Sequence, residues 1–154
     1  MAHPLDNPTW TALTTLQAEL ALVEDSARRF PPDVCPHGAF AEPTQDAWDA
    51  LSRLAQQPVS LFSTHPLRIP SGWTITRSVE LYEMLQDDGD WLRESGRNDL
   101  GGSRIEDLTP ADLPQMASLY EATRPGRSLS PRLYVLGGFV GIKREDQLDR
   151  KSVV

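Results

Sequence analysis

A thiol and an imidazole stand close together in Cys35-Pro36-His37. A cysteine becomes a nucleophile when a neighbouring base or cation favours its thiolate, as a cysteine hydrolase requires. A ring and a thiol on either side of a proline in a Pro-rich loop give no such base geometry, and two ligands do not make a zinc site. His3 and His65 each adjoin a proline without a second ligand at metal spacing, so we expect loop or capping histidines and no metal site. A cysteine hydrolase built on Cys35 is one hypothesis for the function, and slow alkylation of the thiol under native conditions would discard it.

The composition excludes several classes of function. The 154 residues carry 15 basic and 22 acidic side chains, a net charge of −7, which repels phosphate backbones and anionic lipids. No apolar run approaches the roughly 20 residues that span a bilayer, and the N-terminus lacks the basic start and apolar centre of a signal peptide. A single cysteine excludes an internal disulfide. We therefore expect a cytoplasmic protein that binds neither nucleic acid nor membrane, and the sequence leaves its oligomeric state open.

The first hundred residues predict two helices and two strands. Asn7 and Pro8 form an N-cap and a first-turn proline at the start of one helix, and Thr44 caps another with an apolar stripe that includes Trp48. Residues 30–43 between them are rich in proline and predict an irregular connection. Short apolar or alternating runs predict strands at residues 59–62 and 73–81. Residues 87–102 are polar and glycine-containing, so we place a linker and the lobe boundary there.

The composition changes after this linker. Residues 105–108 predict a strand, and Thr109, Pro110 and Asp112 combine an N-cap, a first-turn proline and an acidic third position, so a helix should begin at Pro110. Its core-facing stripe ends near residue 123. Ser130 opens a further helical turn, and residues 139–143 predict a strand that leads into a turn at 145–147. The strand that pairs with residues 139–143 is expected to follow this turn, but too little of the chain remains to supply it. The fold class is therefore α+β, with an N-terminal lobe over residues 1–102.

The order of these elements resembles the opening of a GNAT N-acetyltransferase domain: a strand from Ile105, a capped helix with Asp-Leu-Pro-Gln-Met, a second helical turn, and then Gly-Gly-Phe-Val-Gly-Ile at 137–142. Residues 3–10, 27–34 and 122–126 resemble the smaller lobe and following helix end of a bacterial two-lobed subgroup. The resemblance covers nearly the whole chain, but none of its motifs is a catalytic signature. It implies a parent enzyme that carries acetyl from its co-substrate acetyl-CoA to a small-molecule or peptide amine.

A phosphate-binding loop is missing from this resemblance. Members of the family carry Arg/Gln-x-x-Gly-x-Gly/Ala before a helix, where backbone N–H groups hold the CoA pyrophosphate. The nearest string, residues 93–98, ends in Asn98 and precedes the acetyltransferase-like region, so it is a chance match. We expect residues 103–148 to be the start of a GNAT domain truncated before the acetyl-CoA motif. This chain alone should then be inactive and bind no cofactor, with catalytic residues beyond Val154 and thus unknown.

The last six residues supply a reason for this absence. Residues 149–154 match the in-frame translation of a common sequencing-adapter oligonucleotide whose next triplet is a stop codon. We hypothesise that they are a non-native tail and that the natural gene continues after about Leu148. A natural stop codon after Val154 in the resequenced locus would contradict this hypothesis.

The resemblance also places the helix that ends near residue 123 beside the acyl-acceptor cleft. Arg124 can orient an anionic substrate group there, or be only a helix-end cation facing the dipole. Glu121 can act as a base toward an incoming amine, or simply face solvent. We take Glu121 and Arg124 as the substrate-binding candidates.

A non-enzymatic protein-interaction module is the alternative function. It would use the N-terminal lobe and Trp91, because a tryptophan in a polar linker hints at a docking surface. Trp10, Trp48 and Trp73 are expected in the core instead. A genuine module should be monodisperse, whereas a fragment should aggregate through an unpaired strand at residues 139–143.

Overall fold

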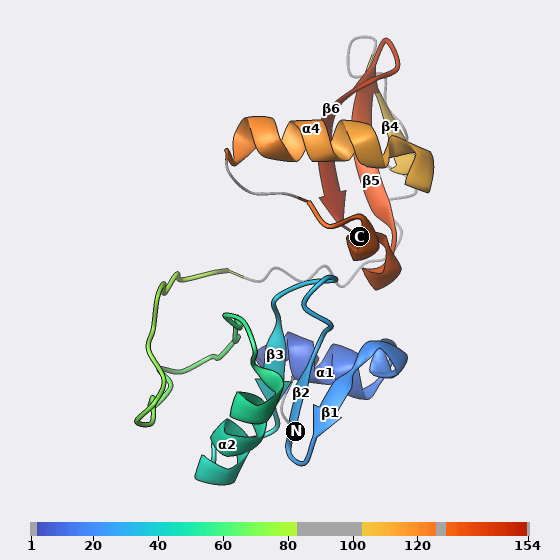
Figure 1. Cartoon of the computed structure of the whole chain (residues 1–154). Helices are drawn as coiled ribbons and strands as arrows, with labels where there is room; N and C mark the ends of the chain where they lie inside the picture. Colours follow the sequence, from blue (N-terminus) through green and yellow to red (C-terminus); the bar gives the residue numbers. More distant parts are fainter. Residues whose placement is uncertain (1–2, 83–102, 126–128, 154) are drawn as a thin grey trace. The chain divides into compact units, whose positions relative to one another are not determined.

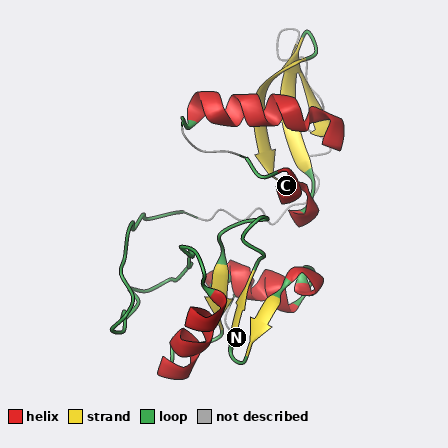
Figure 2. Cartoon of the chain, viewed as in Figure 1, coloured by secondary structure: helices red, strands yellow, loops and turns green. Residues whose placement is uncertain are grey.

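The computed structural model describes residues 3–82, 103–125 and 129–153. The chain separates into two compact units, Met1–Met84 and Leu85–Val154, and each is described here by itself. Each contains helices and a three-stranded antiparallel sheet, which confirms the α+β class (Figures 1 and 2). The lobe boundary predicted at residues 87–102 lies outside the described residues.

The N-terminal unit begins with two helical segments that local capping explains. The 3-10 helix η1 covers Pro4–Asp6 and helix α1 covers Pro8–Thr14, followed by η2 at Ala18–Leu20. The Asn7 side chain accepts a hydrogen bond from the N–H of Trp10 at 3.2 Å, as an N-cap does. The same side chain donates to the carbonyl of Phe40 at 2.9 Å, which ties the start of α1 to strand β3. The predicted helix start is therefore confirmed.

The sheet of this unit has the order β1-β2-β3, with β1 at Leu22–Glu24, β2 at Ala27–Arg29 and β3 at Gly38–Phe40. Helix α2, Gln45–Leu54, packs on the sheet and begins at the predicted cap, because Thr44 Oγ1 accepts from the N–H of Ala47 at 3.2 Å. Its buried face carries Trp48, whose ring meets those of Phe40 and Trp73 at 5.1 and 5.2 Å. The predicted core position of Trp48 is confirmed, whereas Trp73 and Trp10 are only half-buried. Trp73 packs against the core, and the Arg28 guanidinium lies over the Trp10 ring at 5.5 Å.

Two strand predictions in this unit are wrong. Residues 59–62 make only an isolated bridge, between Ser60 and His37, and residues 73–81 form no strand. Ile75, Val79 and Leu81 are each more than half exposed, because their alternation meets no neighbouring strand among residues 3–82. The third strand instead lies in the 30–43 segment predicted to be irregular. Its Gly38 allows a close approach, since a Cβ atom there would lie 2.7 Å from Val59 Cγ2.

The C-terminal unit follows the predicted order of elements. Strand β4 covers Ser103–Leu108, η3 Pro110–Asp112, α4 Leu113–Thr123, η4 Pro131–Leu136, β5 Phe139–Arg144 and β6 Gln147–Val153. The capping box predicted at Thr109 and Asp112 is present, and the Ser130 side chain accepts from the N–H of Arg132. Helix α4 crosses one face of the sheet (Figure 1). The core between them consists of Leu108, Met116, Phe139 and Leu148.

Strand β5 is the central strand of this sheet, so the expectation that it lacks a partner is wrong. It pairs with β4 from Leu108↔Phe139 to Ser103↔Arg144, and with β6 from Phe139↔Val153 to Arg144↔Gln147, with a bulge at Ile142/Lys143. Positive φ angles at Glu145 (50°) and Asp146 (65°) make the tight turn that reverses the chain. Aggregation through an unpaired β5 therefore loses its physical basis.

Residues 149–153 of the segment ascribed to a non-native tail lie in β6, and Val154 lies outside the described residues. The absence of a strand partner was one of the grounds for that hypothesis, and residues 147–153 now supply the partner. The hypothesis about the gene itself stays a prediction.

Candidate functional site

The C-terminal end of helix α4 carries the two predicted substrate-binding residues. Arg124 is the C-cap residue, and its N–H donates to the carbonyl of Tyr120 at 2.8 Å. Its guanidinium carbon lies 5.5 Å from the centre of the Tyr120 ring, which is a cation–π distance. Glu121 is exposed in the last helical turn. The predicted helix end at these residues is confirmed, and their binding role stays a prediction.

A second cation, Lys151 of β6, approaches the same tyrosine. Its ammonium nitrogen lies 5.8 Å from the centre of the Tyr120 ring and 5.5 Å from that of Phe139. Lys151 pairs with Gly141 across β5 and β6, so its side chain emerges on the sheet face that also carries Phe139. We call Tyr120, Arg124, Phe139 and Lys151 the cation–aromatic cluster.

Lys151 was missed from the sequence because residues 149–154 were set aside as a tail. The signal that could have found it is the turn at residues 145–147, which folds the next residues back along β5. Chemically, two cations on one aromatic ring attract an anionic group such as a carboxylate.

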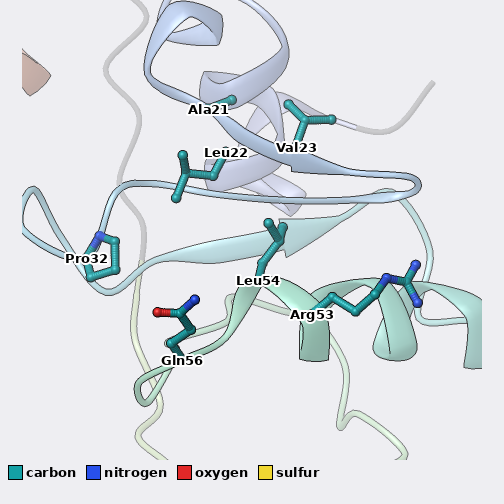
Figure 3. A pocket seen from close by; sticks show the side chains of 7 residues that line it. All are labelled: Ala21, Leu22, Val23, Pro32, Arg53, Leu54 and Gln56. Carbon is teal, nitrogen blue, oxygen red and sulfur yellow. The ribbon is translucent and has the colours of Figure 1, made fainter.

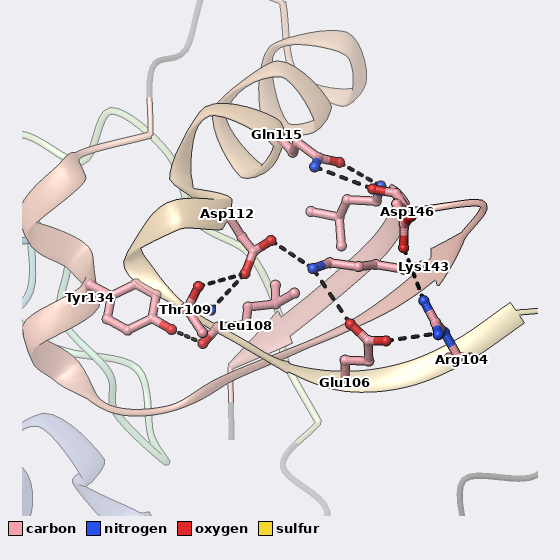
Figure 4. Close-up of polar contacts among 10 residues, drawn as sticks. Arg104, Glu106, Leu108, Thr109, Asp112, Gln115, Tyr134, Lys143 and Asp146 are labelled. Carbon is pink, nitrogen blue, oxygen red and sulfur yellow. Dashed lines mark hydrogen bonds and ion pairs between the residues drawn. The ribbon is translucent and has the colours of Figure 1, made fainter.

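A separate polar network joins the start of α4 to the sheet (Figure 4). Lys143 Nζ lies 2.7 Å from Asp112 Oδ1 and 3.5 Å from Glu106 Oε2. Hydrogen bonds from Lys143, and then from Thr109, lower the pKa of the Asp112 carboxyl, and the bond to Asp112 raises the pKa of Lys143. A carboxylate whose pKa is lowered is a poor general base at neutral pH. We therefore interpret this network as structural.

Two further contacts hold the same region together. Gln115 of α4 accepts from the N–H of Leu148 at 2.7 Å and donates to the carbonyl of Asp146 at 3.4 Å, which binds the helix to the β5–β6 hairpin. The hydroxyl of Tyr134 donates to the carbonyl of Leu108, and its ring lies 5.2 Å from Phe139. This hydroxyl is already engaged in a backbone contact.

The N-terminal unit offers no activated thiol at Cys35. The side chain is 6% exposed, and burial raises the pKa of the thiol by more than a hydrogen bond from the backbone of His37 and the positive charge of Arg29 lower it. The His37 ring lies 5.1 Å from Phe62, burial lowers its pKa, and its Nδ1 atom has no hydrogen-bond partner. The geometry thus disfavours a cysteine hydrolase, because ring and thiol form no hydrogen-bonded pair.

The remaining histidines behave as predicted. His3 Nδ1 accepts from the N–H of Leu5 at 3.1 Å and caps η1, and His65 is an exposed loop residue hydrogen-bonded to Thr64 at 2.9 Å. Within the described ranges, His, Cys, Asp and Glu side chains form no group of three that could hold a metal ion.

No described helix has the length and apolar character needed to cross a bilayer. Trp91 and residues 93–98 lie outside the described residues.

Comparisons with known proteins give a likeness of fold. No family model matches the sequence, and no curated protein matches it. Among solved structures, the chain is similar to a protein assigned to the GNAT family of acetyltransferases from Novosphingobium aromaticivorans, with a TM-score of 0.67 and 24% sequence identity. The match covers 99% of this chain and 64% of the other. The 154 residues thus share the fold of somewhat less than two thirds of that acetyltransferase.

Proposed function

We propose that this chain forms the acceptor-binding side of an acetyl-CoA-dependent N-acetyltransferase. The observation that carries the proposal is the fold match over 99% of the chain to a structure assigned to that family. The β4–α4–η4–β5 order supports it, since this is the order that the resemblance to the family implied. The finer assignment to a bacterial two-lobed subgroup belongs to the same proposal.

In the proposed reaction, the amine nitrogen of the acceptor loses a proton and attacks the thioester carbon of acetyl-CoA. A new C–N bond forms, the C–S bond breaks, and the CoA thiolate leaves and takes up a proton. Arg124 and Lys151 hold an anionic group of the acceptor, and Glu121 receives the proton that the amine loses. Lys151 lies within residues 149–154, so its role also depends on the natural gene encoding these residues.

The 154 residues by themselves are not expected to hold acetyl-CoA. The printed sequence has no Arg/Gln-x-x-Gly-x-Gly/Ala string after β5, and a pyrophosphate needs such a row of backbone N–H groups. Calorimetric titration with CoA should give no binding heat, and acetyl-CoA mixed with amines should release no thiol. Stoichiometric CoA binding with acylation of an amine by this chain would contradict the proposal.

Acceptor binding can be tested without acetyl-CoA. We expect 4-aminobutyrate, but not butylamine, to shift the NMR signals of the Tyr120 ring, because only the former carries a carboxylate. Arg124→Gln and Lys151→Gln should each weaken this effect. Arg150→Gln is the matched control, since Arg150 precedes Lys151 on β6 and pairs with Ile142, so its side chain faces the other side of the sheet. Equal shifts with butylamine, or equal loss in the control variant, would reject the anion-binding role.

A protein-interaction module is the second candidate, and one observation favours it. Ile75, Val79 and Leu81 expose 59%, 56% and 61% of their surface within a segment that forms no strand, and exposed apolar patches often mark docking surfaces. This function predicts that replacing the three residues by serine abolishes capture of a specific partner while the fold is kept. Retention of that partner by the triple variant would count against the module.

A further inference from the structure

A groove in the N-terminal unit lies between strand β1 and the C-terminal end of α2 (Figure 3). Its volume is about 380 Å³. Five of its lining residues are apolar, and its polar members are Arg53 and Gln56. The apolar residues are Ala21, Leu22, Val23, Pro32 and Leu54. Leu22 and Val23 expose 41% and 50% of their surface. The groove therefore offers apolar contact to a short aliphatic chain.

Arg29 of β2 is buried next to two residues that line this groove, Leu22 and Leu54, and does not itself line it. It is the cross-strand partner of Leu22, and partners across an antiparallel pair project from the same sheet face, so its side chain lies on the groove side. Its Nη1 atom donates to the carbonyl of Leu54, a groove residue, at 3.0 Å, and Nε donates to the carbonyl of Phe30 at 3.2 Å. The residue has no exposed surface, and Nη2 has no hydrogen-bond partner among the described residues.

This arrangement leaves a buried cation incompletely satisfied. Burial lowers the pKa of the Arg29 guanidinium, since desolvation disfavours its charged form. Carbonyls of Leu54 and Phe30 occupy part of its donor set, but a buried donor without a partner destabilises the protein. Arg53 does not share this deficit, because its guanidinium pairs with Glu24 and Asp25 at 2.6 Å each. A ligand carboxylate would supply the acceptor that Arg29 lacks.

We propose that the groove binds a small aliphatic carboxylate, whose oxygen accepts from Arg29 Nη2 while its hydrocarbon tail packs on Leu22, Val23 and Leu54. A carboxylate matches the planar guanidinium and neutralises its charge, and the apolar lining matches a chain of a few carbons. Arg29 has no exposed surface in the unliganded chain, so side chains that line the groove must move for the head group to reach Nη2. The carboxylate can belong to a free short-chain acid or to the C-terminus of a peptide, which share this chemistry.

The experiment is an NMR titration of the whole chain that follows the Arg29 Nε–Hε signal. Butyrate is the probe for a free acid, N-acetyl-Ala-Val with a free carboxyl end is the probe for a peptide terminus, and butyramide is the neutral control. We expect saturable shifts with one of the carboxylates and none with butyramide. The carboxylate that binds more tightly identifies the source.

Two matched variants separate the site from general charge effects. Leu22→Glu places a carboxylate opposite Arg29, so it should raise the thermal midpoint and weaken carboxylate binding by at least about tenfold, or 1.4 kcal/mol. Leu16→Glu makes the same change at a side chain that is 98% exposed and should leave binding within about twofold of the parent. Failure of both carboxylates to shift the Arg29 signal, equal shifts with butyramide, or equal weakening in both variants would overturn the proposal. These outcomes are independent of acetyl transfer.

Discussion

A methyl group added at Gly141 should destabilise the C-terminal unit. Its Cβ atom would lie 2.5 Å from Leu148 Cδ1, 2.8 Å from Leu108 Cδ2 and 3.0 Å from the carbonyl oxygen of Arg150. Leu108 and Leu148 belong to the buried core, and the Arg150 oxygen belongs to the backbone. None of these three neighbours can therefore move away freely from an added methyl group. Overpacking costs about 1–3 kcal/mol, and alanine recovers about 0.4–1 kcal/mol through the unfolded state. The expected net loss for Gly141→Ala therefore lies between about 0 and 2.6 kcal/mol and is about 1.3 kcal/mol at the middle of these ranges.

The assay must report on this unit alone. Urea unfolding followed through the ¹³C-labelled methyl group of Met116 meets this need, because Met116 is fully buried in the same core. Gly138→Ala is the matched control, since a Cβ atom there meets nothing within 4 Å. Its free energy of unfolding should rise by about 0.4–1 kcal/mol, because alanine there restricts the unfolded chain and meets no clash in the folded one.

A double-mutant cycle with Leu148→Ala tests the cause of the loss. Leu148 is 6% exposed, so its truncation alone should cost about 2–5 kcal/mol. It also removes the atom nearest to the added methyl group, so Gly141→Ala should cost less in this background, with a coupling of at least about 0.5 kcal/mol. Equal stability of the Gly141 and Gly138 variants, or an unchanged cost in the Leu148→Ala background, would refute the β5–β6 packing.

Three further outcomes follow from the charged and buried groups. Because the pKa of Asp112 is lowered on folding, this carboxylate stabilises the protein above its unfolded pKa, and the stabilisation is lost as pH falls through the folded pKa. The urea midpoint of unfolding, followed through the Met116 signal, should therefore fall less steeply at acid pH in Asp112→Asn than in the parent. The pH dependence is opposite for Lys143, whose pKa is raised on folding: it stabilises the protein at neutral pH, and this stabilisation is lost only as pH rises through the folded pKa. Lys143→Met should therefore lower the urea midpoint at pH 7 but not at strongly alkaline pH. In the native chain, Cys35 should react with iodoacetamide at least about tenfold more slowly than in urea, because it is buried and its thiol pKa is raised. Mass spectrometry measures both rates. Equal rates would reopen the hydrolase hypothesis.

The sequence predicted best what a few consecutive residues decide. The caps at Asn7, Thr44 and Ser130 and the capping box at Thr109 all appear in the structure, because a cap depends on a side chain and a backbone N–H only two or three residues away. The family resemblance placed β4, α4 and β5 in the right order for the same reason. Of these elements, the helix carries its own start signal in the capping box, whereas the two strands were predicted from short runs of residues.

Pairing between strands was harder to predict. Alternation of apolar and polar residues shows which face of a strand is buried, but it does not show which other strand lies beside it. The alternation over residues 73–81 met no partner strand among the described residues, while β1 and β2 have three residues each and give too short a pattern to detect. The turn at residues 145–147 was recognised and a partner strand was expected after it, but the few residues that follow were not expected to supply that strand, and its apparent absence then supported the tail hypothesis. The error therefore came from separating the last residues from their turn.

The candidate sites divide in the same way. Arg124 could be placed because it follows a capped helix and precedes Pro125, whereas its shared contact with Lys151 on Tyr120 requires β6 to lie beside α4. Arg29 gave no signal, since an arginine in a short strand is ordinarily exposed and its burial depends on α2 packing over it. Both sites arise from contacts between elements.

The pairing of β5 also changes which experiment separates an enzyme fragment from an interaction module. An unpaired central strand would have made aggregation the mark of a fragment, but the outer strands of this sheet are β4 and β6. Strand β6 carries Asp149, Arg150 and Lys151, and charges on an outer strand oppose pairing with another chain. Monodisperse behaviour is thus expected under both hypotheses and distinguishes neither. The distinction rests on binding chemistry: a carboxylate-bearing amine at the cation–aromatic cluster supports the acetyltransferase assignment, and a protein held at the exposed apolar residues of segment 73–81 supports the module.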